Sequence, residues 1–138
     1  MMQRDYILRE IEKIGAIINA FRQKIFGGSE NLAITLEKQI ENSKVMLFNE
    51  MNFDLDKFLT LNVEDLKEYI SGFEGFSIEN IELLADCLSQ ICFDDNCNSP
   101  KMYLEKSLQL YELCNLKSKS YSFEREANIR EIQSVLKQ

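Results

Sequence analysis

The chain has 138 residues, of which 45% are hydrophobic and 28% are charged, and its formal net charge is −7. This length and composition exclude a disordered chain and predict one soluble domain, residues 1–138, with a hydrophobic core. The charge is concentrated in residues 48–98, where twelve acidic and two basic side chains give −10 and leave the flanks together at +3. Nucleic-acid binding needs a basic face, so this balance argues against it.

The sequence contains no signal for secretion or membrane insertion. Charged side chains between Arg4 and Lys13 interrupt the first helical segment, so it lacks the apolar core of a signal peptide. No run approaches the roughly 18 apolar residues that a membrane-spanning helix requires. We therefore predict a cytoplasmic protein that does not interact with membranes.

The N-terminal segment predicts a long helix. Its hydrophobic residues recur at alternating steps of four and three, which places them on one face. They are Ile7, Ile11, Ile14, Ile18, Phe21 and Ile25. Gly27–Ser29 ends this helix, and a second is expected from about Glu30 to Asn49. Two such helices joined by a short turn predict an antiparallel hairpin over residues 1–51. The apolar face could instead form a homodimer through the first helix.

The second predicted helix carries its apolar side chains on one side, at Leu32, Leu36, Ile40 and Leu47. Short acidic helices are expected over residues 52–76, and the side chains that should point inward are Phe53, Leu55, Phe58, Leu59, Leu66, Tyr69 and Ile70. Asn62 is a suitable N-cap because Glu64 and Asp65 follow it in the first turn. Gly72 and Gly75 end this part.

Three further helices are expected over residues 77–138. The first is capped by Ser77, and its buried stripe consists of Ile81, Leu84, Ala85, Leu88 and Ile91. Ser99 followed by Pro100 starts the second, with an inward stripe of Leu104, Leu108 and Tyr111 and with Cys114 beside it. The last begins at about Ser122 and should bury Phe123, Ala127, Ile132 and Leu136. Sustained alternation of apolar and polar residues is absent, so the predicted class is all-α.

Between two of these helices lies a stretch with the ligand spacing of a calcium-binding EF-hand loop. Positions 1, 3, 5 and 12 of such a loop would be Asp94, Asn96, Asn98 and Glu105. Position 6 favours glycine but is Ser99, and Pro100 and Lys101 follow at positions 7 and 8. We therefore favour a simple turn, with Glu105 on the solvent face of the next helix, and keep a calcium-binding module as an alternative.

The four cysteines are predicted to be reduced thiols that fill space in the core. Cys87, Cys92 and Cys97 are five residues apart, a spacing that matches no common zinc pattern, and Cys114 lies further on. The chain also lacks histidine, so neither a mixed Cys/His metal site nor a Ser/His or Cys/His catalytic pair can form. We predict no metal and no cofactor.

The stretch LLADCLSQICFDDNCNSPKMYLEKSLQLYEL has the length and layout of one tetratricopeptide repeat (TPR). Leu84, Leu88 and Ile91 lie on its first helix, and Ser107 stands where the repeat favours alanine so that the paired helices approach closely. The tryptophan and glycine of the repeat are missing. A single repeat cannot bury its own face, so it would pack on other helices of this chain.

Three segments resemble, in the same order, a family of short uncharacterised all-helical bacterial proteins. They are MQRDYILREIEKI near the start, LFNEMNFDLDKFLTLNVEDL in the middle and YLEKSLQLYEL near the end. The resemblance covers nearly the whole chain. It implies a helical fold with a TPR-like C-terminal half and a bacterial, intracellular origin, and it implies no catalytic residues.

These features together predict a non-enzymatic interaction or scaffold domain that binds a protein or peptide or associates with itself. Helical repeats form grooves for helices and extended segments, and the acidic middle predicts a partner rich in Lys or Arg. The residues expected at the contact surface are Asp86, Asp94, Asp95, Tyr103 and Tyr111.

A small carboxylate-dependent enzyme is a further alternative. The candidate acid–base pairs are Asp54 with Asp56 and Asp94 with Asp95, although adjacent aspartates are more typical of a turn.

Overall fold

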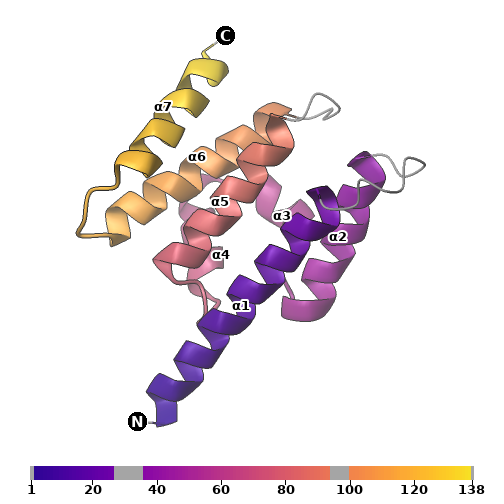
Figure 1. The fold of residues 1–138 in the computed structure, drawn as a ribbon, viewed down its shortest axis with the longest axis vertical. Coiled ribbons are helices and arrows are strands. Elements are labelled where there is room, and N and C mark those ends of the chain that lie inside the picture. Colours follow the sequence, from indigo (N-terminus) through magenta and orange to yellow (C-terminus); the bar gives the residue numbers. More distant parts are fainter. Residues whose placement is uncertain (1, 27–35, 94–99, 138) are drawn as a thin grey trace. The chain divides into compact units, whose positions relative to one another are not determined.

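A computed structural model describes residues 2–26, 36–93 and 100–137 of the chain. The helices in these ranges are α1 (Met2–Phe26), α2 (Leu36–Met51), α3 (Leu55–Thr60), α4 (Val63–Ser71), α5 (Ile78–Cys92), α6 (Pro100–Lys117) and α7 (Phe123–Leu136) (Figure 1). The described residues contain no strand, which confirms the all-α class. Contacts divide the chain into two compact units, residues 1–80 and 81–138, and the boundary along the sequence falls in the first turn of α5. The assignment of the whole chain to a single domain stays a prediction.

In residues 1–80, α1 and α2 lie side by side and run in opposite directions (Figure 1). Their shared face buries most of the predicted apolar positions, namely Ile14, Ile18, Phe21, Ile25, Ile40 and Leu47. Ile17 is also buried. Ile7 departs from the prediction because it is exposed: α1 has 25 residues and α2 only 16, so the first turns of α1 extend beyond α2. The predicted connection at Gly27–Ser29 lies outside the described residues, as does Leu32.

Local signals set the ends of the short helices in this unit. Asn52 ends α2 in the left-handed region (φ 58°), and its N–H donates to the Phe48 carbonyl at 2.9 Å. Asp54 caps α3 by accepting from the N–H of Lys57 at 3.1 Å. Asn62 caps α4 as predicted, by accepting from the N–H of Asp65 at 2.8 Å.

The core of residues 1–80 contains a cluster of five aromatic rings. Phe53 lies at its centre, and the distances from its ring centroid to its neighbours are 5.1 Å to Phe58, 5.4 Å to Tyr69, 5.7 Å to Phe73 and 6.0 Å to Phe76. The Tyr69 hydroxyl also accepts from the backbone N–H of Asp54 at 2.9 Å. The rings therefore join α3 to α4 and to the turn that follows α4.

In residues 81–138, α5 buries the whole predicted stripe and α6 packs against α7. Ser107 on α6 is fully buried, and its hydroxyl donates to the carbonyl of Ala85 on α5 at 2.7 Å. This bond confirms the close approach predicted for a small residue at position 107. Leu108 is only half-buried, whereas Leu110 and Leu113, which the sequence analysis did not single out, are buried.

The predicted inner face of the last helix is partly wrong. Ser122 caps α7 as expected, but Phe123 is 82% exposed and Ala127 is also exposed, whereas Ile129 and Arg125 are buried alongside Ile132. Arg125 lies inward because its guanidinium finds polar partners: Nε donates to Glu82 at 2.7 Å and Nη1 to Asn115 at 3.1 Å. A guanidinium whose hydrogen bonds are satisfied can be buried. The buried face of α7 therefore includes Arg125 and differs from the face predicted from hydrophobic residues alone.

Candidate functional site

A pocket in residues 1–80 has a volume of about 400 Å³ and is the candidate functional site. Three parts of the unit line it: the first half of α1, the end of α2 with its terminal turn, and the turn after α4. The lining residues are Tyr6, Glu10, Lys13, Ile14, Glu50, Met51, Asn52, Gly72, Phe73 and Glu74. We call this pocket the acidic groove. Its volume lies in the range of about 300–1,000 Å³ that is common for ligand sites.

A close backbone contact fixes one wall of the acidic groove. At Gly75, a Cβ atom would lie 2.4 Å from the carbonyl oxygen of Glu10, so only glycine lets the turn after α4 lie against α1 at this point. Asn80 strengthens the same contact. Its Nδ2 donates to the Ile11 carbonyl at 2.9 Å and to the Gly75 carbonyl at 2.8 Å. Gly15 leaves room for this amide, because a Cβ there would lie 2.9 Å from its Oδ1.

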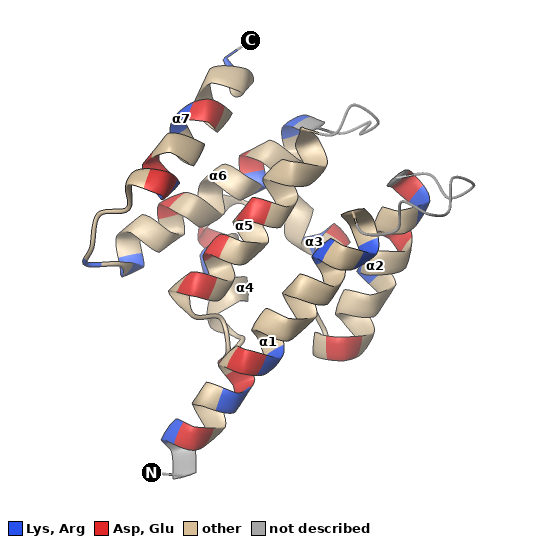
Figure 2. Ribbon diagram, viewed as in Figure 1, with Lys and Arg blue, Asp and Glu red and all other residues tan. Residues whose placement is uncertain are grey.

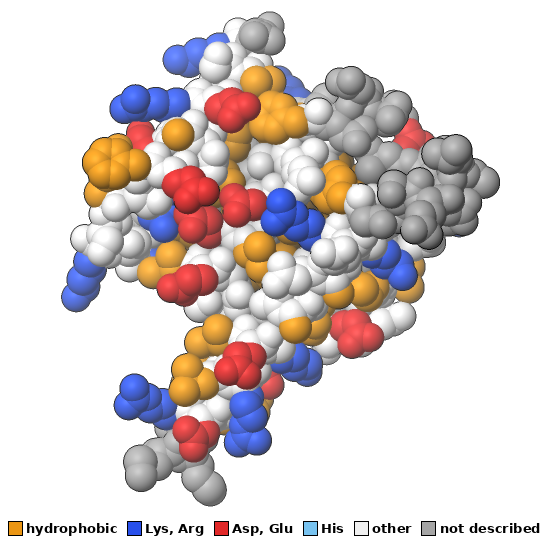
Figure 3. All heavy atoms as spheres, viewed as in Figure 1, with side chains coloured by type: hydrophobic (Ala, Val, Ile, Leu, Met, Phe, Trp, Pro, Cys, Tyr) orange, Lys and Arg blue, Asp and Glu red, His pale blue; other side chains and the backbone are white. Residues whose placement is uncertain are grey.

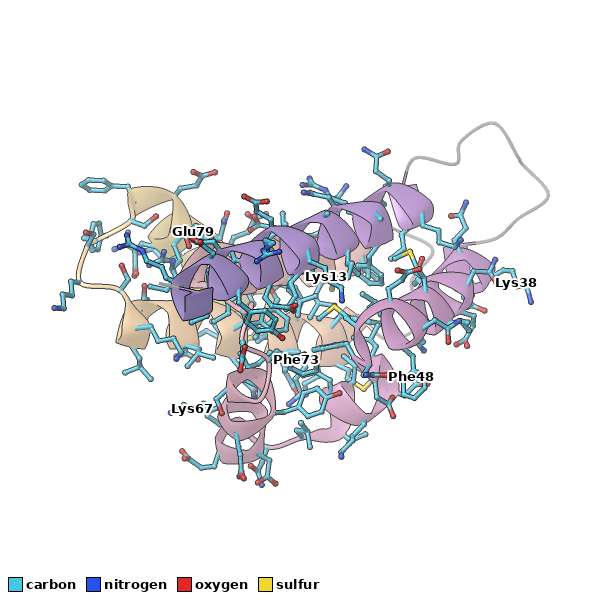
Figure 4. The ribbon with its side chains drawn as sticks, turned by 90° about the horizontal axis from the view of Figure 1, so that it is seen from below. Lys13, Lys38, Phe48, Lys67, Phe73 and Glu79 are labelled. Carbon is cyan, nitrogen blue, oxygen red and sulfur yellow. The ribbon has the colours of Figure 1, made fainter. Side chains whose placement is uncertain are left out.

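Aromatic packing supports the apolar part of the groove. Phe73 lines the groove and contacts the rings of Phe53, Tyr69 and Phe76 at centroid distances between 5.4 and 5.7 Å. Figure 4 shows Phe73 below α1, with Lys13 at the lower side of that helix. The groove thus has a wall that is anchored in the core, and Ile14 and Met51 add further apolar surface.

Three carboxylates from three different segments give the groove its negative charge. They belong to Glu10 on α1, Glu50 at the end of α2 and Glu74 in the turn after α4, and Lys13 is the single cation in the lining. None of these four side chains forms an ion pair with another described residue. The lining therefore carries a formal charge of −2. This arrangement can attract a cationic group while its apolar wall contacts the carbon atoms of the same ligand.

The second pocket, of about 300 Å³, lies between α2 and α3. Lys44 Nζ lies 2.8 Å from Asp56 Oδ1 and 3.1 Å from Glu41 Oε1, and the third carboxylate of the lining, Asp54, accepts the N–H of Lys57. Val45 and Phe48 are exposed beside it, and Figure 4 shows Phe48 on α2. The lining has the same formal charge of −2 as the acidic groove, but each of its carboxylates already has a partner within the chain, so this pocket offers less to a charged ligand.

Of the predicted contact residues that the structure describes, Tyr103 and Tyr111 are buried and Asp86 is half-buried. Tyr111 is 1% exposed and donates its hydroxyl proton to Asp86, and Tyr103 is also buried, so neither ring lies on a contact surface. Burial, together with this hydrogen bond to Asp86, raises the pKa of Tyr111 well above its usual value. Asp94 and Asp95 lie outside the described residues.

A second titratable side chain that is buried in this unit belongs to Lys106, five residues before Tyr111. The Lys106 side chain is 6% exposed and donates to Gln109 at 2.9 Å. Desolvation lowers the pKa of Lys106, and the carboxylate of Glu105 partly offsets this effect. Glu105 itself is exposed on α6, as predicted. The other three EF-hand positions, Asp94, Asn96 and Asn98, lie outside the described residues.

The carboxylate pair Asp54 and Asp56 is used structurally. Asp54 caps α3 and Asp56 pairs with Lys44, so the two carboxylates have separate partners and do not form an acid–base pair. Cys87, Cys92 and Cys114 are buried and form no disulfide within the described ranges, whereas Cys97 lies outside them. In the same ranges, no group of three or more acidic, Cys or His side chains is arranged to hold a metal ion.

Acidic side chains also line α5. This helix contains Glu79, Glu82 and Asp86 and no Lys or Arg, and Figure 2 shows its charged segments all in red. Glu82 pairs with Arg125 and Asp86 accepts from Tyr111, so two of the three serve packing in residues 81–138. The acidic middle of the sequence therefore combines structural carboxylates with carboxylates that line the groove.

No protein-family model matches this chain, and neither a curated protein nor a solved structure gives a significant match. None of the helices within the described ranges is both long and apolar enough to span a bilayer.

Sequence reasoning did not find the acidic groove. Its lining comes from positions about 40 and 25 residues apart along the chain, and Glu10 lies outside the segment in which acidic residues are concentrated. The one usable signal was Gly75, which was interpreted as a helix terminator. Gly75 together with Asn80, five residues later, also fits a close contact between two backbones.

Proposed function

We propose that this chain is a non-enzymatic interaction module that binds a basic segment of a protein or peptide in the acidic groove. The observation that carries the proposal is the combination of three carboxylates, Glu10, Glu50 and Glu74, with the apolar wall at Phe73 in one pocket. A Lys or Arg side chain suits such a site because its charged end interacts with carboxylates while its aliphatic part contacts apolar surface.

A TPR-like arrangement of the C-terminal half belongs to the same proposal. The contact that supports it is the bond between Ser107 and the Ala85 carbonyl, since closely paired helices are typical of such repeats. In this proposal the C-terminal half acts as a scaffold, and the recognition of the basic segment belongs to residues 1–80.

The test is a titration that follows fluorescence anisotropy with two labelled peptides. One alternates Lys or Arg with Phe and Leu, and the other carries Glu in place of each basic residue. The basic peptide should bind, and its affinity should fall steeply when salt rises from about 50 mM to about 500 mM, because screening weakens exposed charge pairs. The acidic peptide should not bind. Capture of the basic peptide that does not depend on salt contradicts the electrostatic part of the proposal.

A pair of matched variants separates the groove from the net charge. Glu50→Lys with Glu74→Lys reverses two charges in the groove, and Glu112→Lys with Glu131→Lys reverses two exposed charges elsewhere. The first variant should bind the basic peptide at least about tenfold more weakly, because attractive pairs become repulsive, and the second should change little. Equal losses in both variants would assign the binding to net charge and reject the groove.

A further inference from the structure

The turn between α6 and α7, with the helix ends beside it, carries the most exposed of the large hydrophobic side chains described in residues 81–138. Leu116 is 70% exposed, Tyr121 is 65% exposed and Phe123 is 82% exposed. Figure 3 shows hydrophobic side chains in orange on the surface near the start of α7. We call residues 116–123 the aromatic turn. Hydrophobic side chains that gather on a surface, in contrast to single exposed ones, are typical of contact sites.

Hydrogen bonds hold the aromatic turn in a defined conformation. The Ser118 hydroxyl donates to the Ser120 carbonyl at 3.0 Å and accepts from the Ser120 N–H at 3.2 Å. Ser122 then caps α7, and the rings of Tyr121 and Phe123 pack edge to face with centroids 4.8 Å apart. A surface that is already ordered loses little conformational freedom when it binds, so this turn is suited to docking.

The aromatic turn is also basic. Its sequence, LKSKSYSF, contains Lys117 and Lys119 and no acidic residue. Neither lysine forms an ion pair with another described residue. The turn therefore presents a charge of +2 beside its exposed apolar side chains, which is the chemistry that the acidic groove is proposed to bind.

From this match we infer that the basic segment is supplied by a second copy of this chain: the aromatic turn of one copy docks in the acidic groove of another. The groove carries −2 and an apolar wall, and the turn carries +2 and two aromatic rings. Complementary charge orients the two surfaces, and burial of Phe123 against the apolar wall supplies the hydrophobic contribution. The inference rests on the proposed function, because it names the partner of the same groove.

This contact joins two different surfaces, so it is heterologous. Each copy that offers its turn to a neighbour still has its own groove available for a third copy. The assembly should therefore grow with concentration beyond a dimer, unless the geometry closes it into a small ring. It differs in this respect from a homodimer through α1, which would stop at two copies.

Light scattering and sedimentation of the full chain test the inference, with two charge-reversed variants. The groove variant carries Glu50→Lys and Glu74→Lys, and the turn variant carries Lys117→Glu and Lys119→Glu. Wild type should exceed its monomer mass of 16.1 kDa as its concentration rises from about 10 μM to about 1 mM. Each variant alone should stay monomeric, because its groove and its turn carry charge of the same sign. An equimolar mixture should associate again, because each variant then meets the opposite charge.

All four substituted positions are exposed, so the variants should fold, and circular dichroism of each variant verifies its helix content. Phe123→Ser should weaken wild-type association at least about threefold, through loss of apolar burial. Association of wild type and both variants alike would assign the contact to another surface, such as α1, and overturn the inference. A wild type that binds the basic peptide but remains at 16.1 kDa overturns the inference and leaves the proposed function standing. A wild type that stays monomeric and also fails to bind the basic peptide rejects both the inference and the proposed function.

Discussion

The two units of this chain keep their helices together by different means. Residues 1–80 rely mainly on apolar packing, with four aromatic rings around Phe53 and a backbone contact that only glycine allows at position 75. Residues 81–138 bury polar groups among their apolar side chains: Arg125 bonds to Glu82 and Asn115, and Tyr111 bonds to Asp86.

This difference predicts different responses to substitution. In the first unit the cost should follow the volume removed or added, because packing is dense and the contacts are apolar. In the second unit the cost should depend on whether a polar partner is left behind, because a buried donor or acceptor without a partner is expensive. The groove lies in the first unit, where the aromatic cluster supports Phe73 in its wall.

The largest effect is expected at the centre of the aromatic cluster. Phe53→Ala should lower the free energy of unfolding by about 3–5 kcal/mol, because it leaves a cavity among four rings. Phe123→Ala is the matched control, since the same ring is removed from a site that is 82% exposed, and should change stability by less than about 0.5 kcal/mol. Chemical denaturation measures both. Similar losses in the two variants would contradict the packing described for residues 1–80.

The glycine contact should be the next most sensitive feature. Gly75→Ala should cost about 2–3 kcal/mol, because the added Cβ would lie 2.4 Å from the backbone oxygen of Glu10 and α1 would have to move. At Gly72, a Cβ would lie 3.3 Å from the Tyr69 oxygen and the backbone is right-handed (φ −71°), so Gly72→Ala should cost much less. Thermal unfolding of the two variants compares them directly. Equal costs would remove the argument for a tight contact at position 75.

In the second unit, Arg125→Met should cost about 1.5–3 kcal/mol, because Glu82 and Asn115 lose their charged donor. Arg130→Met provides the control: this side chain is 75% exposed, its pairing with Glu126 spans 3.7 Å, and its loss should be nearly neutral. Adding Glu82→Leu to Arg125→Met should recover part of the loss, since no carboxylate is then left unpaired. A double variant less stable than the sum of the single variants would contradict this description of the polar contacts.

The smallest effect is expected at Tyr111. Tyr111→Phe should cost about 1 kcal/mol near neutral pH, because the bond to Asp86 is lost while the ring remains. The raised pKa of Tyr111 adds a pH dependence. The folded state keeps the hydroxyl protonated while the unfolded state loses the proton near pH 10, so this contribution is complete below about pH 10 and falls as the pH rises further.

The slope of unfolding free energy against pH, measured from about pH 9 to about pH 11, reveals this contribution by the difference between wild type and Tyr111→Phe. Wild type should lose stability more steeply than the variant. Parallel slopes would show that the hydroxyl of Tyr111 is not held protonated in the folded state.

Much of the fold followed from the sequence because local signals agree with one another. The N-caps Asn62, Ser77 and Ser122 all accept the predicted backbone N–H bonds. The stripe on α5 is buried as predicted, because that helix has an almost continuous apolar face. The prediction of the buried face of α7 was wrong because a count of hydrophobic residues cannot show that Arg125 has hydrogen-bond partners on α5 and α6.

The candidate site was much less predictable. The interpretation of an acidic middle emphasised carboxylates, but it named Asp86, which bonds to Tyr111, and did not name Glu10, which lies outside the acidic segment. Periodicity shows which side of each helix is apolar. It does not show which helix ends meet, and the groove forms where the end of α2 and the turn after α4 lie against α1. The contacts of Gly75 and Asn80 establish that α1 meets the turn after α4, and the pocket lining adds the end of α2.

The central claim is that a basic segment binds in the acidic groove, and nuclear magnetic resonance of the full chain tests it most directly. The peptide that alternates Lys or Arg with Phe and Leu is titrated into isotope-labelled protein at low salt, and backbone amide shifts are recorded. The account predicts the largest shifts at Glu10, Glu50 and Glu74 and at their neighbours in the lining. Saturating shifts confined to other surfaces, or no shifts at millimolar peptide, would contradict it.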